Sequence, residues 1–253
     1  MFTSLVLFTQ FFTKLNIPIA IPEPTNKFRS SIQYLTLFSF LLGCLEAGIV
    51  GLFMFILPKW LVWIFYWIID GLITGGFHLD ALADTADGLF SSRQPAKILD
   101  IMKDSRIGTM GALALIYYYI LAIALGINLA RILSPWCLLA LVVTCTMVTK
   151  TGLSLLFYRM VYAGKKNGLS VIWLHIAPWR IVIAQVFSVI IIGWLFSWSG
   201  LISYGLIIVS AYFYRRKIVQ ILGGFSGDTL GAFASLTPVI FLFGLNLTFQ
   251  LLR

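Results

Sequence analysis

The sequence predicts an all-α, polytopic membrane protein that forms a single integral membrane domain over residues 1–253. Hydrophobic residues make up 60% of the chain and charged residues only 11%, and the mean hydropathy is +0.98. Soluble domains carry roughly a quarter charged residues. Apolar runs near or above the ~20 residues needed to cross a bilayer recur along the whole chain. This recurrence favours one helical bundle over a soluble domain with an anchor, because helices satisfy their own backbone polar groups in lipid.

Seven apolar runs are expected to cross the membrane as helices. They cover residues 32–57, 60–79, 107–130, 136–158, 181–198, 201–222 and 232–252. The sixth has the weakest boundary, because Arg215, Arg216 and Lys217 occupy its last turns. Residues 1–13 are apolar but too short to span and lack the positive start of a signal peptide. We therefore expect a short helix at the membrane interface there.

The placement of basic residues predicts the orientation. Fourteen of the 18 Lys and Arg residues lie before the first span, after the second and fourth, or in the last turns of the sixth. By the positive-inside rule, the N-terminus is cytoplasmic and the C-terminus is outside. The net charge of +9 then reflects topology and contact with membrane lipid or an anionic substrate, and no nucleic-acid partner is expected. The three cysteines are widely separated within spans and predict no disulfide or zinc framework.

The segment from Gly75 to Gly108 holds five of the nine acidic residues on the expected cytoplasmic side. These are Asp80, Asp84, Asp87, Asp100 and Asp104. The first three are spaced i, i+4, i+7 and the last two i, i+4, so each set shares one face of a helix. We expect two short helices, with a break at Gly88 to Ser92, that bring Asp84 and Asp87 opposite Asp100 and Asp104 as a four-carboxylate cup. Such carboxylates repel one another unless a cation lies among them, so a solvated acidic face is the weaker alternative.

The donor types indicate which metal such a cup would hold. All the candidate ligands are hard carboxylate oxygens, and no cysteine lies nearby. This favours Mg²⁺, with Mn²⁺ as a substitute, and the cup has room for one or two ions.

Two further carboxyls, Glu46 and Asp70, fall near the middle of the first two spans. They are either protonated or paired with a cation such as Lys150 in the fourth span. In the loop after that span, a turn at Lys165 to Gly168 either holds a phosphate or serves only as a positive-inside loop.

A glycine-rich turn, GGFSGDTLGA, begins at Gly223 near the end of the chain. Glycines around Ser226 and Asp228 at a helix start would present backbone N–H groups to an anion. The pattern Gly-Gly-Phe-x-x-Asp-x-Leu occurs both at Gly75 to Leu82 and at Gly223 to Leu230. Both copies end spans that run toward the cytoplasm, so a parallel repeat would place them at one site. Coincidence is the alternative interpretation.

Four segments resemble a known family over essentially the full length of the chain. GGFHLDALADTADGLFSS, KDSRIGTMGALAL, GGFSGDTLGA and the early FFTKLNIP are similar to signature segments of the cobalamin synthase family, the adenosylcobinamide-GDP ribazoletransferases. The resemblance implies a membrane enzyme of a prokaryote that joins α-ribazole, or its 5′-phosphate, to adenosylcobinamide-GDP. It also implies release of GMP and a requirement for Mg²⁺. A homo-oligomer is possible, and the sequence leaves that open.

That chemistry needs metals to neutralise a diphosphate, a carboxylate to accept a hydroxyl proton and cations for the leaving phosphate. The candidate metal ligands are Asp80, Asp84, Asp87, Asp100 and Asp104, of which Asp84, Asp87 and Asp104 are also the candidate catalytic residues. The candidate substrate-binding residues are His78, Arg93, Lys103, Arg106, Lys150, Gly223, Gly224, Gly227 and Asp228. Two alternatives stay open: a lipid enzyme like the CDP-alcohol phosphotransferases, and a cation transporter that uses the intramembrane carboxylates.

Overall fold

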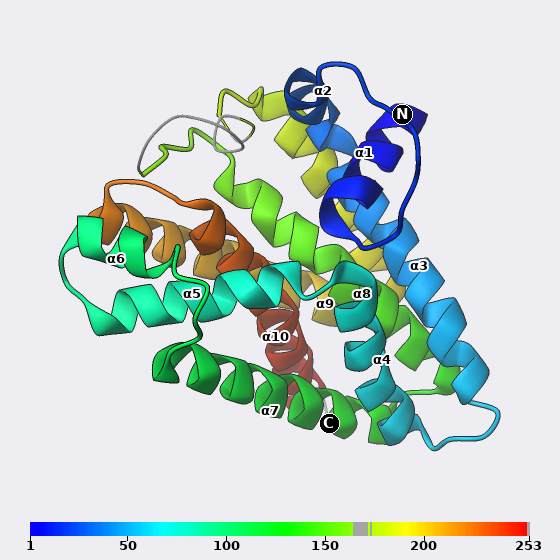
Figure 1. Ribbon diagram of the computed structural model, residues 1–253. Coiled ribbons are helices and arrows are strands. Elements are labelled where there is room, and N and C mark those ends of the chain that lie inside the picture. Colours follow the sequence, from blue (N-terminus) through cyan, green and yellow to red (C-terminus); the bar gives the residue numbers. More distant parts are fainter. Residues whose placement is uncertain (164–171, 173, 252–253) are drawn as a thin grey trace.

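The structure, a computed structural model, describes residues 1–163, 172 and 174–251, and this part of the chain is built from helices (Figure 1). In chain order the elements are α1 (Phe2–Phe12), α2 (Pro24–Ser31), the 3₁₀ helix η1 (Ile32–Tyr34), α3 (Leu35–Phe53), α4 (Lys59–Thr74), α5 (Phe77–Ser91), α6 (Pro95–Ile101), α7 (Thr109–Ile132), α8 (Pro135–Leu156), α9 (Pro178–Leu222) and α10 (Gly227–Leu251). The prediction of an all-α bundle is confirmed.

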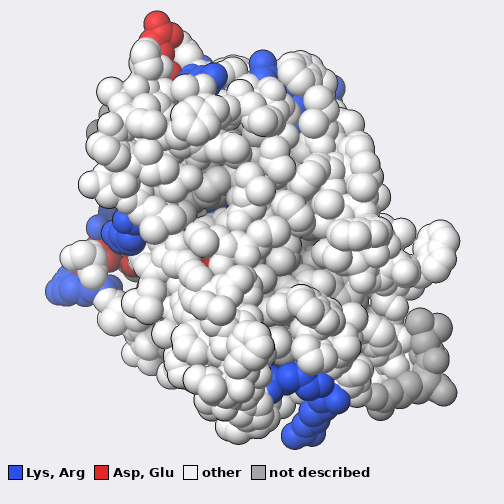
Figure 2. Space-filling view, turned by 90° about the vertical axis from the view of Figure 1, so that its right-hand side faces the viewer, with Lys and Arg blue, Asp and Glu red and all other residues white. Residues whose placement is uncertain are grey.

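Five helical segments of the described chain are long and apolar enough to cross a bilayer. They are Pro24–Phe53, which includes α3, and the helices α7, α8, α9 and α10. The pair α4 and α5 passes the same test only together, and its two helices are bent by 91°. Figure 2 shows a broad face that is almost free of charged side chains, with Lys and Arg gathered near its edges. The protein is therefore a multi-pass membrane protein.

Helix α9 contains two predicted spans, and it folds back on itself between them. Its 45 residues would measure ~67 Å if straight, more than twice the ~30 Å core of a bilayer. The helical backbone is broken at Ser197, where φ is 50° and ψ is −139°. Tyr204 Oη donates to Gln185 Oε1 at 2.7 Å across 19 residues, which requires the chain to reverse. Its two arms agree with the predicted spans 181–198 and 201–222, so seven crossings are consistent with the structure.

Two predicted boundaries near the acidic segment were wrong. Helix α4 ends at Thr74, because Gly75 and Gly76 adopt positive φ angles of 67° and 68°, so the second span stops short of residue 79. Helix α5 continues through Gly88 to Ser91 instead of breaking there. A Cβ atom on Gly88 would lie 2.8 Å from Met102 Cγ. This glycine therefore allows α6 to fold back closely against α5.

Helix α8 forms the centre of the bundle, and its closest neighbour is α3. A Cβ atom added to Gly43 would lie 2.7 Å from the carbonyl oxygen of Val143. Beside this contact, Ser39 Oγ donates to the carbonyl of Thr146 at 2.5 Å. At the N-terminus, Phe8 and Phe12 of α1 pack into an aromatic cluster that is separate from the main core of the bundle. The location of α1 at the membrane interface stays a prediction.

We expect Gly43→Ala to destabilise the fold, because the added methyl group meets the backbone of α8 and neither helix can yield without separating. Overpacking of this kind costs about 1–3 kcal/mol in the free energy of unfolding. Thermal melting of the purified protein in detergent measures it. The matched control is Gly48→Ala on the same helix, where no atom lies within 4 Å of the added Cβ. Equal melting temperatures for the two variants would contradict the close approach of α3 and α8.

Candidate functional site

The two copies of the Gly-Gly-Phe pattern have related structures, which differ at the phenylalanine: Phe77 starts α5, whereas Phe225 pairs with Val161 and Ala163 before α10 begins. Gly75 ends α4 and Gly223 ends α9, each in the left-handed conformation with φ of 67° and 75°. In each copy a helix then begins with an aspartate in its first turn, Asp80 in α5 and Asp228 in α10. The sequence repeat is therefore also a structural repeat.

The two helices that follow these turns pack directly on each other. A Cβ atom on Gly231 of α10 would lie 2.6 Å from the Cβ of Ala81 of α5. Asp80 and Asp228 consequently line one cavity of about 140 Å³. The predicted meeting of the two turns at one place is confirmed.

This cavity, which we call the acidic cavity, has one apolar and one polar side. Phe11, Phe12 and Phe77 form an aromatic wall, and His78, Asp80, Gly227 and Asp228 contribute polar groups. The aromatic wall was not predicted from the sequence. Phe77 is 45% exposed, whereas Phe225, which occupies the same position in the other copy of the repeat, is fully buried. The repeat marked both positions, but it did not show which phenylalanine would face a cavity.

Asp84 does not line the acidic cavity itself, but it lies close enough to Asp80 and Asp228 for their charges to act on it. Burial raises the pKa of Asp84 to about 7, and the charges of Asp80, Asp228 and Asp87 add to the rise. Asp228, in the first turn of α10, lies within reach of the charge of Asp80. These carboxylates lie in one another's electric fields. A cation among Asp80, Asp84 and Asp228 would relieve their repulsion.

The predicted four-carboxylate cup is not formed, and other partners of its members explain why. Asp87 accepts hydrogen bonds from the backbone N–H groups of Gly108 at 2.7 Å and Gly111 at 2.8 Å. It thereby caps the N-terminus of α7, where N–H groups lack intrahelical acceptors. Asp104 forms an ion pair with Arg106 at 2.6 Å. Hydrogen bonds from the side chain and the backbone N–H of Arg106 lower the pKa of Asp104 to about 2.

No three His, Cys, Asp or Glu side chains within the described ranges are arranged to hold a metal ion. Metal ligation by Asp87, by the exposed Asp100 and by Asp104 therefore stays a prediction.

The glycine-rich turn uses most of its backbone N–H groups within the protein. The N–H of Gly223 donates to Val219, that of Phe225 to Val161, and that of Ser226 to Thr229 Oγ1. A Cβ on Gly224 would lie 2.7 Å from the carbonyl oxygen of Val161, so this glycine serves close packing. Of the three predicted glycines, only Gly227 lines the acidic cavity.

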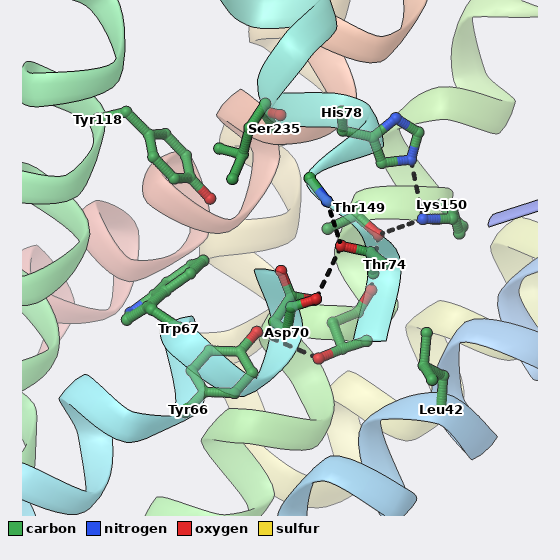
Figure 3. A pocket seen from close by; sticks show the side chains of 13 residues that line it. Leu42, Tyr66, Trp67, Asp70, Thr74, His78, Tyr118, Thr149, Lys150 and Ser235 are labelled. Atoms are coloured by element: carbon green, nitrogen blue, oxygen red, sulfur yellow. Dashed lines mark hydrogen bonds between the residues drawn. The ribbon is translucent and has the colours of Figure 1, made fainter. Parts of the chain in front are cut away.

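A second cavity of about 30 Å³ lies beside the acidic cavity and is lined by buried polar groups (Figure 3). Lys150 is 2% exposed, and its Nζ lies 2.9 Å from His78 Nε2. The charges of Asp70 and Glu46 act on this lysine, but no ion pair joins it to either carboxyl in the described part of the chain, so protonated and paired carboxyls both stay open. Glu46 in turn accepts a hydrogen bond from Thr146 Oγ1 at 2.5 Å. Lys150 therefore contacts His78, and its predicted contact with a substrate phosphate stays a prediction.

The other predicted cations lie at the surface. Arg93, Lys103 and Arg106 are exposed. Lys103 is close enough to Asp228 for its charge to act on that carboxyl, whereas Arg106 is engaged by Asp104. The predicted Lys165 to Gly168 turn lies outside the described residues.

Comparisons with known proteins agree over nearly the whole chain. The family model described as cobalamin-5-phosphate synthase matches residues 4–246. A Listeria welshimeri protein named adenosylcobinamide-GDP ribazoletransferase is 37% identical over 250 residues, which cover 98% of this chain and 99% of that protein. Relatives of the same name come from Clostridium novyi, 34% identical with 96% of both chains covered, and from Escherichia coli, 34% identical with 81% and 84% covered. No solved structure matches.

We expect Asp87→Ala to lower stability, because the N–H groups of Gly108 and Gly111 would lose their acceptor at the start of α7. Loss of such a cap costs about 1–2 kcal/mol, and the measurement is the thermal melting temperature in detergent. Glu23→Gln, which changes an exposed carboxylate, is the control and should melt like the wild type. An unchanged melting temperature for Asp87→Ala would show that Asp87 does not anchor α7.

Proposed function

Because the chain belongs to the cobalamin-5-phosphate synthase family, we propose that it is an adenosylcobinamide-GDP ribazoletransferase of cobalamin synthesis. It joins α-ribazole, or α-ribazole 5′-phosphate, to adenosylcobinamide-GDP and releases GMP. The observation that best supports a catalytic site is the acidic cavity, where the structural repeat brings Asp80 and Asp228 together.

The reaction breaks one phosphoanhydride bond and forms one phosphodiester bond. A ribazole hydroxyl oxygen attacks the phosphorus that carries cobinamide, and GMP leaves with the electron pair of the broken P–O bond. The hydroxyl proton needs an acceptor, and a carboxylate within hydrogen-bond reach is suited to this. Asp84 has no hydrogen-bond partner within the described chain, so its carboxylate is available to accept this proton.

The donor types at the acidic cavity support a magnesium ion as part of the proposal. Asp80 and Asp228 come from the two copies of the repeat and offer hard oxygen ligands of the kind that Mg²⁺ prefers. Burial and, after it, the charges of nearby carboxyls raise the pKa of Asp84, and a cation would offset the second effect. When bound, Mg²⁺ neutralises charge on the diphosphate. A dependence on Mg²⁺, with one or two ions and Mn²⁺ as a substitute, is part of the proposal.

The orientation also belongs to the proposal. The basic segments that flank the predicted spans support a prokaryotic cell membrane with the N-terminus and the acidic cavity on the cytoplasmic side. Seven crossings then place the C-terminus outside, and the basic segments meet anionic lipid headgroups.

We expect the purified protein to release GMP only when both adenosylcobinamide-GDP and α-ribazole, or its 5′-phosphate, are present. EDTA should stop the release and added Mg²⁺ should restore it, because the diphosphate needs charge neutralisation. Chromatography of nucleotides measures GMP directly. Ion flux into liposomes with neither substrate would support the transporter instead, and CMP release from a CDP-alcohol lipid would support a lipid enzyme.

Asp80 and Asp228 should act as one unit. We expect Asp80→Ala and Asp228→Ala each to lower kcat/KM by ~100-fold, because each removes a carboxylate that acts in the transition state. The double variant should lose little more than the worse single variant, since residues of one unit give non-additive losses. Steady-state kinetics on all three variants measures this, with Glu23→Gln as control. Strict additivity would show two independent sites.

A further inference from the structure

His78 forms the wall between the two cavities. Its side chain lines both the acidic cavity and the smaller polar cavity. Nε2 lies 2.9 Å from Lys150 Nζ, and Figure 3 shows the second ring nitrogen on the edge that faces away from the lysine. That nitrogen, Nδ1, is buried and has no hydrogen-bond partner within the described residues. It lies next to Gly231, whose added Cβ would be 3.3 Å away and which also lines the acidic cavity.

Lys150 determines which nitrogen of His78 carries the proton. The lysine is buried, the carboxyls of Asp70 and Glu46 act on its charge, and its Nζ lies 4.6 Å from the ring centroid of Phe12. Burial opposes the charge of the lysine, whereas nearby carboxyls and an aromatic face favour it, and we take the ammonium as the form present in this arrangement. An ammonium group only donates hydrogen bonds, so Nε2 of His78 must accept. The remaining nitrogen, Nδ1, then carries the hydrogen of the neutral ring.

A buried N–H group without an acceptor is unfavourable, so this donor is free for a ligand. The ligand that enters the acidic cavity must carry acceptor oxygens and must tolerate neighbouring carboxylates once these are offset by a cation. A phosphate group meets both conditions.

We propose that Lys150 is a positioning residue that holds His78 in the Nδ1–H tautomer, and that this N–H donates to a phosphate oxygen of the substrate in the acidic cavity. The identity of that substrate rests on the proposed function, whereas the tautomer does not. In this arrangement the predicted contact of Lys150 with phosphate is replaced by an indirect one, through the imidazole ring.

The tautomer can be read without any activity, because the chain contains only two histidines, His78 and His175. Protein labelled with ¹⁵N-histidine and purified with a histidine-free tag gives two sets of ring signals. His175→Asn assigns them, since His175 is exposed with φ of 59°, a conformation that asparagine tolerates. We expect Nδ1–H for His78 in the wild type and in Lys150→Arg, and a shift toward Nε2–H in Lys150→Met.

Two results would overturn the role of Lys150. One is an Nε2–H tautomer in the wild-type protein, which alone decides the matter even where Lys150→Met fails to fold. The other is an unchanged His78 signal in a folded Lys150→Met, with folding checked by thermal melting and by the His175 signal.

Kinetics tests the contact with substrate. An asparagine amide places its donor near the position of Nδ1, whereas glutamine places it near Nε2. We expect His78→Gln and His78→Ala to lower kcat/KM by about 10- to 100-fold, as expected for one lost charge-assisted hydrogen bond, and His78→Asn to keep most of the activity. His175→Asn is the matched control and should act like the wild type. Equal losses in the Asn and Ala variants would overturn the phosphate contact. A wild type without turnover would instead refute the proposed function and leave the tautomer result readable.

Discussion

The close contact between α5 and α10 is the constraint on which the site depends. Gly231 has no side chain, so α10 approaches Ala81 of α5 closely enough to place two aspartates on one cavity. Each helix follows a glycine that ends the preceding membrane helix in the left-handed conformation, with α5 beginning at Phe77 after Gly75 and α10 beginning at Gly227 after Gly223. Each glycine allows the chain to leave one helix and start another at a new angle, which is 91° between α4 and α5. The acidic cavity is thus built from two related turns and one small-residue contact.

The carboxylates of the acidic segment have divided roles because their neighbours differ. Asp87 faces the N-terminus of α7, where two backbone N–H groups stabilise its negative charge. Asp84 lies one turn earlier on the same helix, and it has other carboxyls rather than N–H groups as neighbours. The charge of Asp87 is therefore stabilised by hydrogen bonds, whereas Asp84 has other negative charges near it. Unbalanced charge beside a cavity is typical of functional sites.

Charged groups within the membrane form a connected set rather than isolated sites. Glu46 from α3, Asp70 from α4 and Lys150 from α8 act on one another's charges, and Lys150 contacts His78 at the cavity wall. Because unpaired charges in lipid cost several kcal/mol, such a set holds its helices in register. The same set orients the ring that separates the polar cavity from the acidic cavity. Packing and site geometry therefore depend on the same residues.

The sequence alone determined the membrane class, the number of apolar segments, the repeat and the resemblance to a family, because these follow from composition, periodicity and local spacing. Even the reversal in α9 was implied by two apolar runs of membrane length on either side of residues 199–200. The partners of Asp84 and Asp87 were decided only by the tertiary structure. Helical spacing placed Asp84 and Asp87 on one face, but it could not show that the start of α7 would pack against Asp87. The repeat did predict that Asp80 and Asp228 meet, but not how closely α5 and α10 pack there, since contacts between distant segments depend on how helices pack and not on the spacing within one of them.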